Sequence, residues 1–425
     1  MCSLLYNVFL HLVTVVLSPA LFVLILLDKY NIRERLGFWK LPPGDRPEGV
    51  VWFHAASMGE VTALATVVDE VKKAHPQLRV AVSTTTISGQ NRAMEFIPTA
   101  EFVFLAPLDL PWAIQRTLQR LHPSALIITE TELWPNTIRM AKACGCRIAL
   151  INGRMSDTSK TRYRMIKGCI TSLLQRFDLL CVQTKIDRDH FIELGAHSEH
   201  VFILGNIKLD LLRFLAGQKK SELSKGSFGI PASSKVIVAG STRPGEEAML
   251  ISNYTRIHEA EPATVFIIAP RHLDRLSEVE GLLTEQGLPV SRRTRIDGST
   301  AIDSGILLLD TMGELSSIYS FADLAFVGGS LVPLGGHNPL EPAMWGIPVL
   351  FGPYRDNVRQ LTDWLLQEQG GIEIRDGDDF TETVIRLLRN PDERKRRGTA
   401  ALKVVQSKAG VSTRTVQLLQ EVGIL

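Results

Sequence analysis

The sequence predicts an α/β protein with two parallel β-sheet domains, and three observations support this prediction. Short apolar runs alternate with amphipathic stretches along most of the 425 residues, a pattern typical of parallel sheets covered by helices. The alternation pauses at a polar segment rich in Lys, Ser and Gly near residues 211–230 and then restarts. A chain of this length is also longer than one hydrophobic core usually supports, which favours two domains.

The expected strands are the apolar runs of the two halves. In the first half they are residues 50–55, 78–86, 101–107, 125–131, 147–153, 179–184 and 200–206. In the second half they are residues 235–242, 263–272, 288–293, 305–311, 324–330 and 348–353. Helical patterns lie between them, as at 110–121 and 185–195. Because ligands bind at the carboxyl ends of strands in open α/β sheets, we expect the site in a cleft where two Rossmann-like domains face each other.

Composition argues against some function classes. The formal net charge is +2, and no long patch interleaves basic and aromatic residues, so nucleic acid is not an expected partner. The five cysteines show no C-x-x-C spacing and are expected to be reduced, which favours a cytosol-facing protein.

The N-terminus has the pattern of a membrane anchor. No charged residue occurs from Leu4 to Leu27, enough for roughly 36 Å of helix at about 1.5 Å per residue. No Lys or Arg precedes this run, which disfavours a signal peptide. The basic residues that follow it predict a cytoplasmic location for the rest of the chain. An anchor that lies flat in the interface is the alternative to a spanning helix.

These patterns define four expected parts of the chain. Residues 1–28 are the hydrophobic anchor helix, 29–212 the N-terminal domain, 213–229 the linker and 230–425 the C-terminal domain.

A glycine-rich stretch in the second half, FVGGSLVPLGGHNPLEPAMWGIPVLFGP, carries the clearest ligand-binding pattern. Asn338 is a natural helix N-cap and Pro339 a natural first helical residue. Free backbone N–H groups of the glycine loop and the positive end of the helix dipole would then suit a nucleotide phosphate. Glu341 could accept hydrogen bonds from ribose hydroxyls, or it could only stabilise its own helix.

Two further strand ends of the second half have residues suited to the same ligand. Pro270 and Arg271 follow a buried strand, and an Arg at this position suits bidentate contact with phosphate. The sequence TMGEL places Met312, Gly313 and Glu314 in another strand–loop–helix turn. A solvated Arg or an ordinary turn would explain each feature singly, but together they indicate a binding site.

The stretch HAASMGE in the first half raises a question about Glu60. The spacing of Ser57 and Glu60 is that of a capping box, in which both side chains only close a helix terminus. Gly59 lies within this first turn, where glycine costs about 1 kcal/mol relative to alanine. Glu60 is therefore either a cap or a carboxylate presented to a substrate.

Other ionisable residues of the first half follow predicted strands. Glu130 and Glu132 come after a buried run, where extended geometry would direct both to one face, and Lys208 ends another predicted strand. Arg162 and Arg164 belong to a basic segment that is either a solvated surface or a dock for an acidic substrate or lipid headgroups.

The motifs HAASMGE, TETELWPN, GNIKLD, APRH, TMGEL and GGHNPLEPAMWGIPVLFGP together resemble those of 3-deoxy-D-manno-octulosonic acid (Kdo) transferases of lipopolysaccharide core assembly. The resemblance covers essentially the whole chain. It implies a GT-B glycosyltransferase of the inner membrane with its catalytic domains on the cytoplasmic side. It also implies CMP-Kdo as donor, bound by the second domain, and lipid IVA, an anionic tetraacyl disaccharide, as acceptor, bound by the first. No cofactor and no metal are implied.

The resemblance also implies residue roles. The catalytic base falls on Glu60, and groups that stabilise the transition state fall on Glu130 and Lys208. Contacts to CMP fall on Pro270, Arg271, Met312, Gly313, Glu314, Asn338, Pro339, Leu340 and Glu341. Ser57, Gly59, Arg162 and Arg164 are the candidates for acceptor binding.

Two other functions remain open from the sequence. One is a related GT-B lipid glycosyltransferase such as a lipid-A-disaccharide synthase that uses a UDP-sugar, and the other is a non-catalytic membrane module that binds a nucleotide sugar. A Rossmann dehydrogenase is disfavoured because no G-x-G-x-x-G follows the first strand of either half. Asp376 and Asp378 have the D-x-D spacing of metal-dependent glycosyltransferases, but their position before a helical run favours a turn and helix cap.

Overall fold

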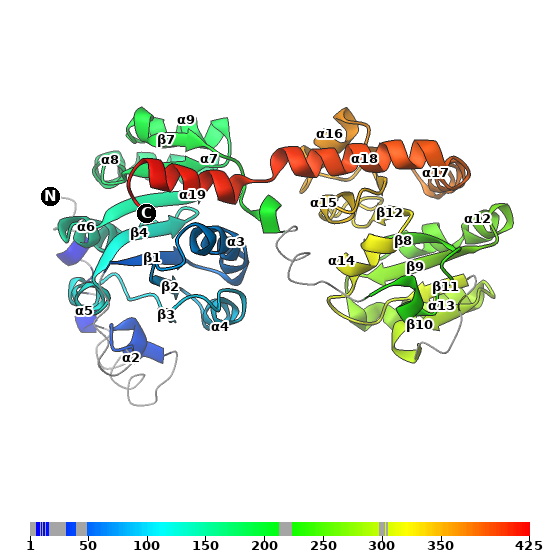
Figure 1. The fold of residues 1–425 in the computed structure, drawn as a ribbon, viewed down its shortest axis with the longest axis horizontal. Helices are drawn as coiled ribbons and strands as arrows, with labels where there is room; N and C mark the ends of the chain where they lie inside the picture. The colour runs from blue at the N-terminus through cyan, green and yellow to red at the C-terminus, as the bar shows by residue number, and fades with distance from the viewer. Residues whose placement is uncertain are drawn as a thin grey trace. The chain divides into compact units, whose positions relative to one another are not determined.

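A computed structural model describes residues 6–8, 10, 12, 14–16, 31–39, 49–211, 223–296, 302 and 305–425. The chain divides into two compact units, and unit 1 contains residues 1–211 and 410–425 while unit 2 contains residues 212–409. Each unit has a parallel sheet with helices packed against it (Figure 1). The predicted fold class of two parallel-sheet α/β domains is therefore confirmed.

The sheet of unit 1 has the order β3-β2-β1-β4-β5-β6-β7, and its paired strands are parallel. Its strands are β1 (Val50–Ala55), β2 (Val80–Thr84), β3 (Phe102–Leu105), β4 (Pro123–Thr129), β5 (Arg147–Gly153), β6 (Leu179–Val182) and β7 (Val201–Ile203). All of β1 is buried, as expected of a central strand covered on both faces. The order reverses between β1 and β4, which is the position where open α/β sheets bind ligands.

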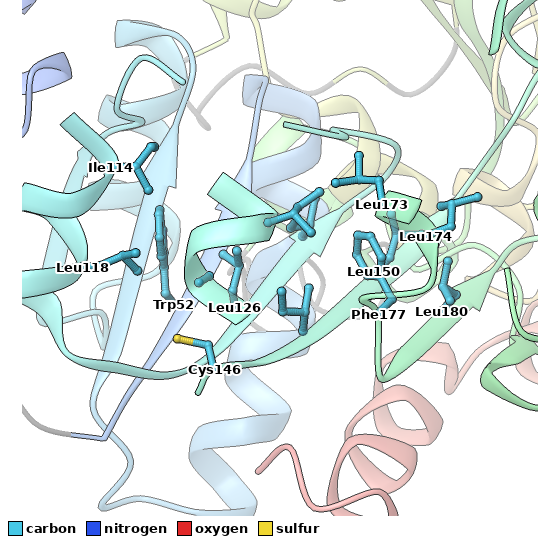
Figure 2. Close-up of a cluster of buried hydrophobic side chains, with 14 of the residues drawn as sticks. Trp52, Ile114, Leu118, Leu126, Cys146, Leu150, Leu173, Leu174, Phe177 and Leu180 are labelled. Carbon is cyan, nitrogen blue, oxygen red and sulfur yellow. The ribbon is translucent and has the colours of Figure 1, made fainter. Parts of the chain in front are cut away.

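Helices cover both faces of this sheet. They are α2 (Ile32–Arg35), α3 (Met58–Ala74), α4 (Ile87–Phe96), α5 (Pro111–Leu121), α6 (Pro135–Ala143), α7 (Asp157–Arg164), α8 (Lys167–Leu174), α9 (Lys185–Glu193) and α19 (Val411–Glu421), with a 3₁₀ turn η2 (Ser198–His200). Figure 2 shows Ile114 and Leu118 of α5 beside Trp52 of β1, and Leu173 of α8 near Leu150 of β5. On α5, buried residues recur at the three- and four-residue spacing of an amphipathic helix.

The sheet of unit 2 has the order β10-β11-β9-β8-β12-β13-β14 and is also parallel. Its strands are β8 (Lys235–Thr242), β9 (Thr264–Pro270), β10 (Val290–Arg292), β11 (Gly305–Leu308), β12 (Leu324–Val327), β13 (Val349–Phe351) and β14 (Gly371–Glu373). The sequence did not predict β14, which is only three residues long.

Two hydrophobic clusters lie in unit 2. One joins the sheet to α11, α12, α13 and α17, and the other joins it to η3, α14 and η6. The helical elements are η3 (Lys225–Phe228), α11 (Glu246–Ile251), α12 (Tyr254–Ala260), η4 (Leu273–Arg275), α13 (Leu276–Glu285), η5 (Arg293–Arg295), α14 (Leu315–Ile318), η6 (Tyr319–Phe321), α15 (Leu340–Ala343), α16 (Arg359–Gln367), α17 (Gly377–Arg389) and α18 (Pro391–Lys408).

The end of the chain corrects the predicted domain boundary. The sequence placed residues 230–425 in one domain, but residues 410–425 belong to unit 1, where α19 packs against α3 (Figure 1). Asp210 fixes the start of this segment, because its carboxylate accepts hydrogen bonds from the N–H groups of Gly410 at 2.5 Å and Ser412 at 2.6 Å. The hydroxyl groups of Thr66 and Ser412 lie 2.7 Å apart.

Two predicted segments fall largely outside the described residues. The structure does not describe most of the expected anchor, residues 1–28. It also does not describe residues 212–222 of the expected linker region. In the described part of the chain, no helix has both the length and the apolar character that crossing a membrane requires.

Candidate active site

Glu60 occupies the first turn of α3, directly after the carboxyl end of β1. Ser57 is the helix N-cap, and its hydroxyl accepts a hydrogen bond from the N–H of Glu60 at 3.4 Å. The Glu60 carboxylate accepts hydrogen bonds from the Ala56 N–H at 2.9 Å and the Ser57 hydroxyl at 2.8 Å. Glu60 is therefore a cap in this structure. A carboxylate has about four lone-pair sites, so these two bonds leave it able to accept a proton.

The environment of Glu60 favours its protonated form more than water does. Burial raises its pKa most, and the negative charge of Glu130 raises it further. The bonds from Ala56 and Ser57 and the charge of Lys208 oppose this rise. A carboxyl group with a raised pKa is a better proton acceptor at neutral pH than an ordinary one.

Three acids and one lysine gather at this edge of the unit 1 sheet. Burial raises the pKa of Glu132, and the charges of Glu60 and Glu130 raise it further. Lys208 donates to Glu130 Oε1 from Nζ at 2.9 Å. The cluster therefore carries several negative charges with Lys208 as their counter-ion.

Asn152 connects the two segments that carry Glu130 and Lys208. It lies near the end of β5, is 2% exposed, and has φ of 55°. Its Oδ1 accepts a hydrogen bond from the Ile207 N–H at 3.1 Å, and its Nδ2 lies 3.5 Å from Glu130 Oε1. Asn152 was not among the site residues predicted from the sequence, although a polar residue at the end of an apolar strand is a usable signal.

Two local expectations about these residues were wrong. The strand β4 ends at Thr129, and Glu130 has φ of 61°, so its position does not follow from extended geometry. Lys208 does not end a strand, because β7 ends at Ile203 and residues 208–211 are helical. The side chains still meet, because the loops after neighbouring parallel strands emerge at one edge of the sheet.

The acceptor candidates of the first half lie at exposed positions. Ser57 and Gly59 are exposed, and a Cβ added to Gly59 would meet no atom within 4 Å. Packing within the described residues therefore does not require glycine there. Arg162 and Arg164 are exposed on α7, and Arg164 lies 3.8 Å from Glu193.

A largely apolar pocket of about 490 Å³ lies close to this basic segment. Its walls include Trp134, Tyr163 and Ile166 together with Arg139 and Arg176. The neighbouring surface is also apolar, because Met165 is 79% exposed and Ile166 is 52% exposed.

The glycine-rich loop of unit 2 follows β12, but its amides are not free as predicted. The buried carboxylate of Glu246 accepts hydrogen bonds from the N–H groups of Gly329, Ser330 and Leu331 at 2.7–2.9 Å. Gly328 packs so closely on β8 that a Cβ there would lie 2.4 Å from the Ser241 carbonyl oxygen. Glu246, the first residue of α11, was not among the site residues predicted from the sequence.

Cationic and imidazole groups surround this loop. Arg243 Nη1 lies 2.5 Å from His272 Nε2, and the N–H of Arg271 donates to the Thr242 carbonyl at 3.0 Å. Burial lowers the pKa of His337, and the charges of Arg271 and Arg243 lower it further. This edge of the sheet is therefore suited to an anion.

The remaining predicted donor contacts lie in two turns of unit 2. Met312 is 74% exposed, and Glu314 accepts a hydrogen bond from Arg293 Nη2 at 3.2 Å. The N-cap of α15 is Pro339 rather than Asn338, whose Oδ1 instead accepts a hydrogen bond from the Leu340 N–H at 3.1 Å.

Glu341 in the first turn of α15 is partly buried. Burial raises the pKa of this carboxyl group, while the charge of Arg271 lowers it. Glu341 and Arg271 therefore lie within electrostatic range at the same end of the sheet. Pro270 is the last residue of β9.

The D-x-D spacing is explained by local structure. Asp376 is the N-cap of α17, and its carboxylate accepts a hydrogen bond from the Asp379 N–H at 2.9 Å. The predicted capping role is confirmed. Among the described residues, no group of three His, Cys, Asp or Glu side chains is placed to hold a metal ion. Of the described cysteines, Cys144, Cys146 and Cys181 are free. Cys169 is disulfide-bonded, so the expectation that it is reduced was wrong.

Comparison with known proteins identifies the family. A family model described as 3-deoxy-D-manno-octulosonic-acid transferase matches residues 30–211. The chain is 31% identical over 397 residues to a 3-deoxy-D-manno-octulosonic acid transferase of Haemophilus influenzae, covering 92% of this chain and 91% of that protein. The chain belongs to the Kdo transferase family. A Kdo transferase of Chlamydia muridarum is 32% identical over 410 residues, which are 94% of each chain.

The resemblance of this chain to Kdo transferases is therefore confirmed, and enzymes of this family are glycosyltransferases. The matched residues 30–211 contain Glu60, Glu130 and Lys208. A UDP-GlcNAc 2-epimerase from Neisseria meningitidis, solved with UDP-GlcNAc, is 13% identical and covers 87% of this chain and 99% of its own, with a TM-score of 0.61. This likeness concerns the fold alone and agrees with two α/β domains that resemble GT-B.

Proposed function

We propose that this Kdo transferase moves Kdo from CMP-Kdo to lipid IVA with inversion at the anomeric carbon. The observation that carries the proposal is the group of Glu60, Glu130, Glu132 and Lys208 in unit 1, where Glu60 has a raised pKa. Perturbed ionisable groups at the carboxyl edge of a parallel sheet are typical of an active site.

Glu60 acts as the general base in this proposal. An acceptor hydroxyl oxygen forms a bond to the anomeric carbon of Kdo while the bond from that carbon to the CMP phosphate oxygen breaks. The hydroxyl proton passes to the Glu60 carboxylate, and CMP leaves with the bonding electron pair. A base on the face opposite the leaving group gives inversion in one displacement.

Glu130 and Lys208 stabilise charge around this step. Positive charge develops at the anomeric carbon in an oxocarbenium-like transition state, and the carboxylate of Glu130 opposes it. Lys208, which bonds to Glu130 at 2.9 Å, supplies a positive charge for the donor carboxylate or phosphate. Glu130 is therefore a stabilising group and not a second base.

Unit 2 holds the donor nucleotide. Arg271 pairs with the phosphate, whose negative charge grows as CMP departs. Glu341 accepts hydrogen bonds from the ribose, and the turns around Met312 and Asn338 complete the CMP contacts. The low pKa of His337 keeps its imidazole neutral at neutral pH, so it can donate or accept a hydrogen bond there.

The lipid acceptor binds unit 1 at the inner membrane, with both units on the cytoplasmic side. The pocket of about 490 Å³ beside exposed Met165 and Ile166 offers an apolar surface for acyl chains. Arg162 and Arg164 supply positive charge for the acceptor phosphates. Residues 1–28 anchor the chain, and their lack of charged residues from Leu4 to Leu27 supports this role.

Mass spectrometry of lipid IVA after incubation with the full chain tests the proposal. With CMP-Kdo, the lipid should gain the mass of one or more Kdo residues, and with UDP-N-acetylglucosamine it should stay unchanged. Transfer from the UDP-sugar would favour a related lipid glycosyltransferase. CMP binding without any product would favour a non-catalytic module.

A further inference from the structure

Glu246 is a fully buried carboxylate that the mechanism does not use. It is the first residue of α11 and is 0% exposed. Its Oε2 accepts hydrogen bonds from the N–H groups of Arg243 at 2.9 Å and Gly329 at 2.7 Å, and its Oε1 from those of Ser330 and Leu331, both at 2.9 Å. A buried charge is tolerated where hydrogen bonds replace its hydration. Four N–H donors oppose the effect of burial here, although burial is the larger effect and raises the pKa of Glu246.

These bonds change what the glycine-rich loop can offer a ligand. Three successive amides of the loop already bind an anionic group that belongs to the protein. The Gly328 N–H is also bonded, to the Gly240 carbonyl at 2.9 Å. A phosphate or carboxylate of the donor would have to compete with Glu246 for these donors, at the cost of leaving a buried carboxylate short of partners.

The same carboxylate fixes the backbone of Arg243, whose side chain passes the loop at Cγ. An ideal Cβ on Gly329 would lie 3.7 Å from Arg243 Cγ and 3.1 Å from His337 Cδ2. The Arg243 Nε atom is buried and has no hydrogen-bond partner in the described structure. The Arg243 guanidinium group therefore has one N–H donor without a partner in the described structure.

We propose that Glu246 is a positioning residue for the donor. It keeps the loop preformed by occupying its amides, and it fixes Arg243 so that the donor's anionic groups are held by the side chains of Arg243 and Arg271 instead of by loop N–H groups. This inference rests on the proposed donor CMP-Kdo, which carries a phosphate and a sugar carboxylate. Preorganised cations of this kind bind an anion without a cost for reordering the loop.

A pair of matched variants tests the role of Glu246. Glu246→Gln replaces one acceptor oxygen by an NH₂ group, which cannot accept the loop N–H bonds. Glu247→Gln is the control, because Glu247 is the next residue of α11, is also 0% exposed, and pairs instead with Arg275 at 2.8 Å. Both variants should lower the melting temperature.

The expected difference is in donor binding. Calorimetric titration of the full chain with CMP should give a Kd for Glu246→Gln about tenfold or more above wild type, and for Glu247→Gln within roughly twofold. The KM for CMP-Kdo should rise in parallel with the Kd, with a smaller change in kcat. Equal CMP affinity in Glu246→Gln and wild type would overturn the proposed role of Glu246 and leave the donor assignment standing. Failure of the wild-type chain to bind CMP would refute both.

Hydrogen exchange of the wild-type chain gives a second test that does not depend on folding of a variant. The amides of Gly329, Ser330 and Leu331 should exchange slowly without ligand, and saturating CMP or CMP-Kdo should change this little. Fast exchange that becomes slow only with ligand would mean that the donor, and not Glu246, occupies these amides.

Discussion

Replacing Glu60 by Gln separates its capping role from its proposed chemical role. The Gln carbonyl oxygen can still accept the bond from the Ala56 N–H, and its amide nitrogen can donate to the Ser57 hydroxyl oxygen, so both contacts near 2.9 Å have a substitute. We expect the free energy of unfolding to change by less than about 1 kcal/mol. Transfer should fall by roughly 10²- to 10⁴-fold, the usual contribution of a general base.

The pH dependence gives a second signature of the same group. The raised pKa of Glu60 means that kcat/KM should fall as pH drops through a value above the ordinary glutamate range, because the base becomes protonated. The stability that Glu60 contributes has the opposite dependence. It is fully present below the unfolded-state pKa and is lost as pH rises through the higher folded-state pKa. Glu60→Gln should remove the titration of Glu60 from the pH profile of kcat/KM and from the pH profile of stability.

The assay is the initial rate of Kdo transfer to lipid IVA, paired with thermal unfolding of the same sample. Glu70→Gln is a matched control, because Glu70 lies on the same helix and bonds to Lys73 at 2.8 Å and Thr413 at 2.9 Å. It should keep full activity. A folded Glu60→Gln variant that transfers Kdo within about tenfold of wild type, well short of the expected loss, would refute the assignment of Glu60 as base.

Four further predictions concern the same molecule. Gly59→Ala should raise the melting temperature, because alanine stabilises a helix by about 1 kcal/mol over glycine and a Cβ there meets no atom within 4 Å. The same variant should reduce kcat/KM if the acceptor approaches this backbone. Unchanged kinetics would show that the acceptor does not approach it. Lys208→Met should move the acidic limb of the rate profile to higher pH, because Lys208 lowers the pKa of Glu60, and an unmoved limb would contradict this coupling. Gly240→Ala should destabilise the protein by roughly 1–3 kcal/mol or more in denaturant titrations, because the added Cβ would lie 1.9 Å from the Tyr319 hydroxyl oxygen; wild-type stability would contradict that packing. Transfer should survive excess EDTA, and its loss with recovery on adding a divalent cation would mean that the reaction needs a metal.

The strands of both units were predictable because a parallel strand buried on both faces is a continuous apolar run. Runs such as 50–55 and 235–242 match β1 and β8. The strand β14, with the sequence Gly-Ile-Glu, has one large apolar side chain and therefore no apolar run. The return of α19 to unit 1 was not predictable either, because its amphipathic pattern would suit a sheet in either unit.

The candidate site was predictable in its residue types more than in its contacts. The strand-end positions of Glu60 and Glu130 indicated an acidic site, and both lie at one edge of the unit 1 sheet. The free amides expected around Gly329 are instead bonded to Glu246, which precedes that loop by 83 residues in the sequence. A hydrogen bond between residues so distant depends on the pairing of β8 with β12 in the sheet, which brings the turn after β8 to the loop after β12. No local sequence pattern indicates this pairing.

The anomeric configuration of the product distinguishes a single displacement from two successive ones. The proposed mechanism has one displacement, with Glu60 as base and no covalent glycosyl intermediate. NMR of the Kdo-bearing lipid should therefore show the configuration at the anomeric carbon inverted relative to CMP-Kdo. A product with retained configuration would contradict the account, because it requires two successive displacements or attack from the face of the leaving group.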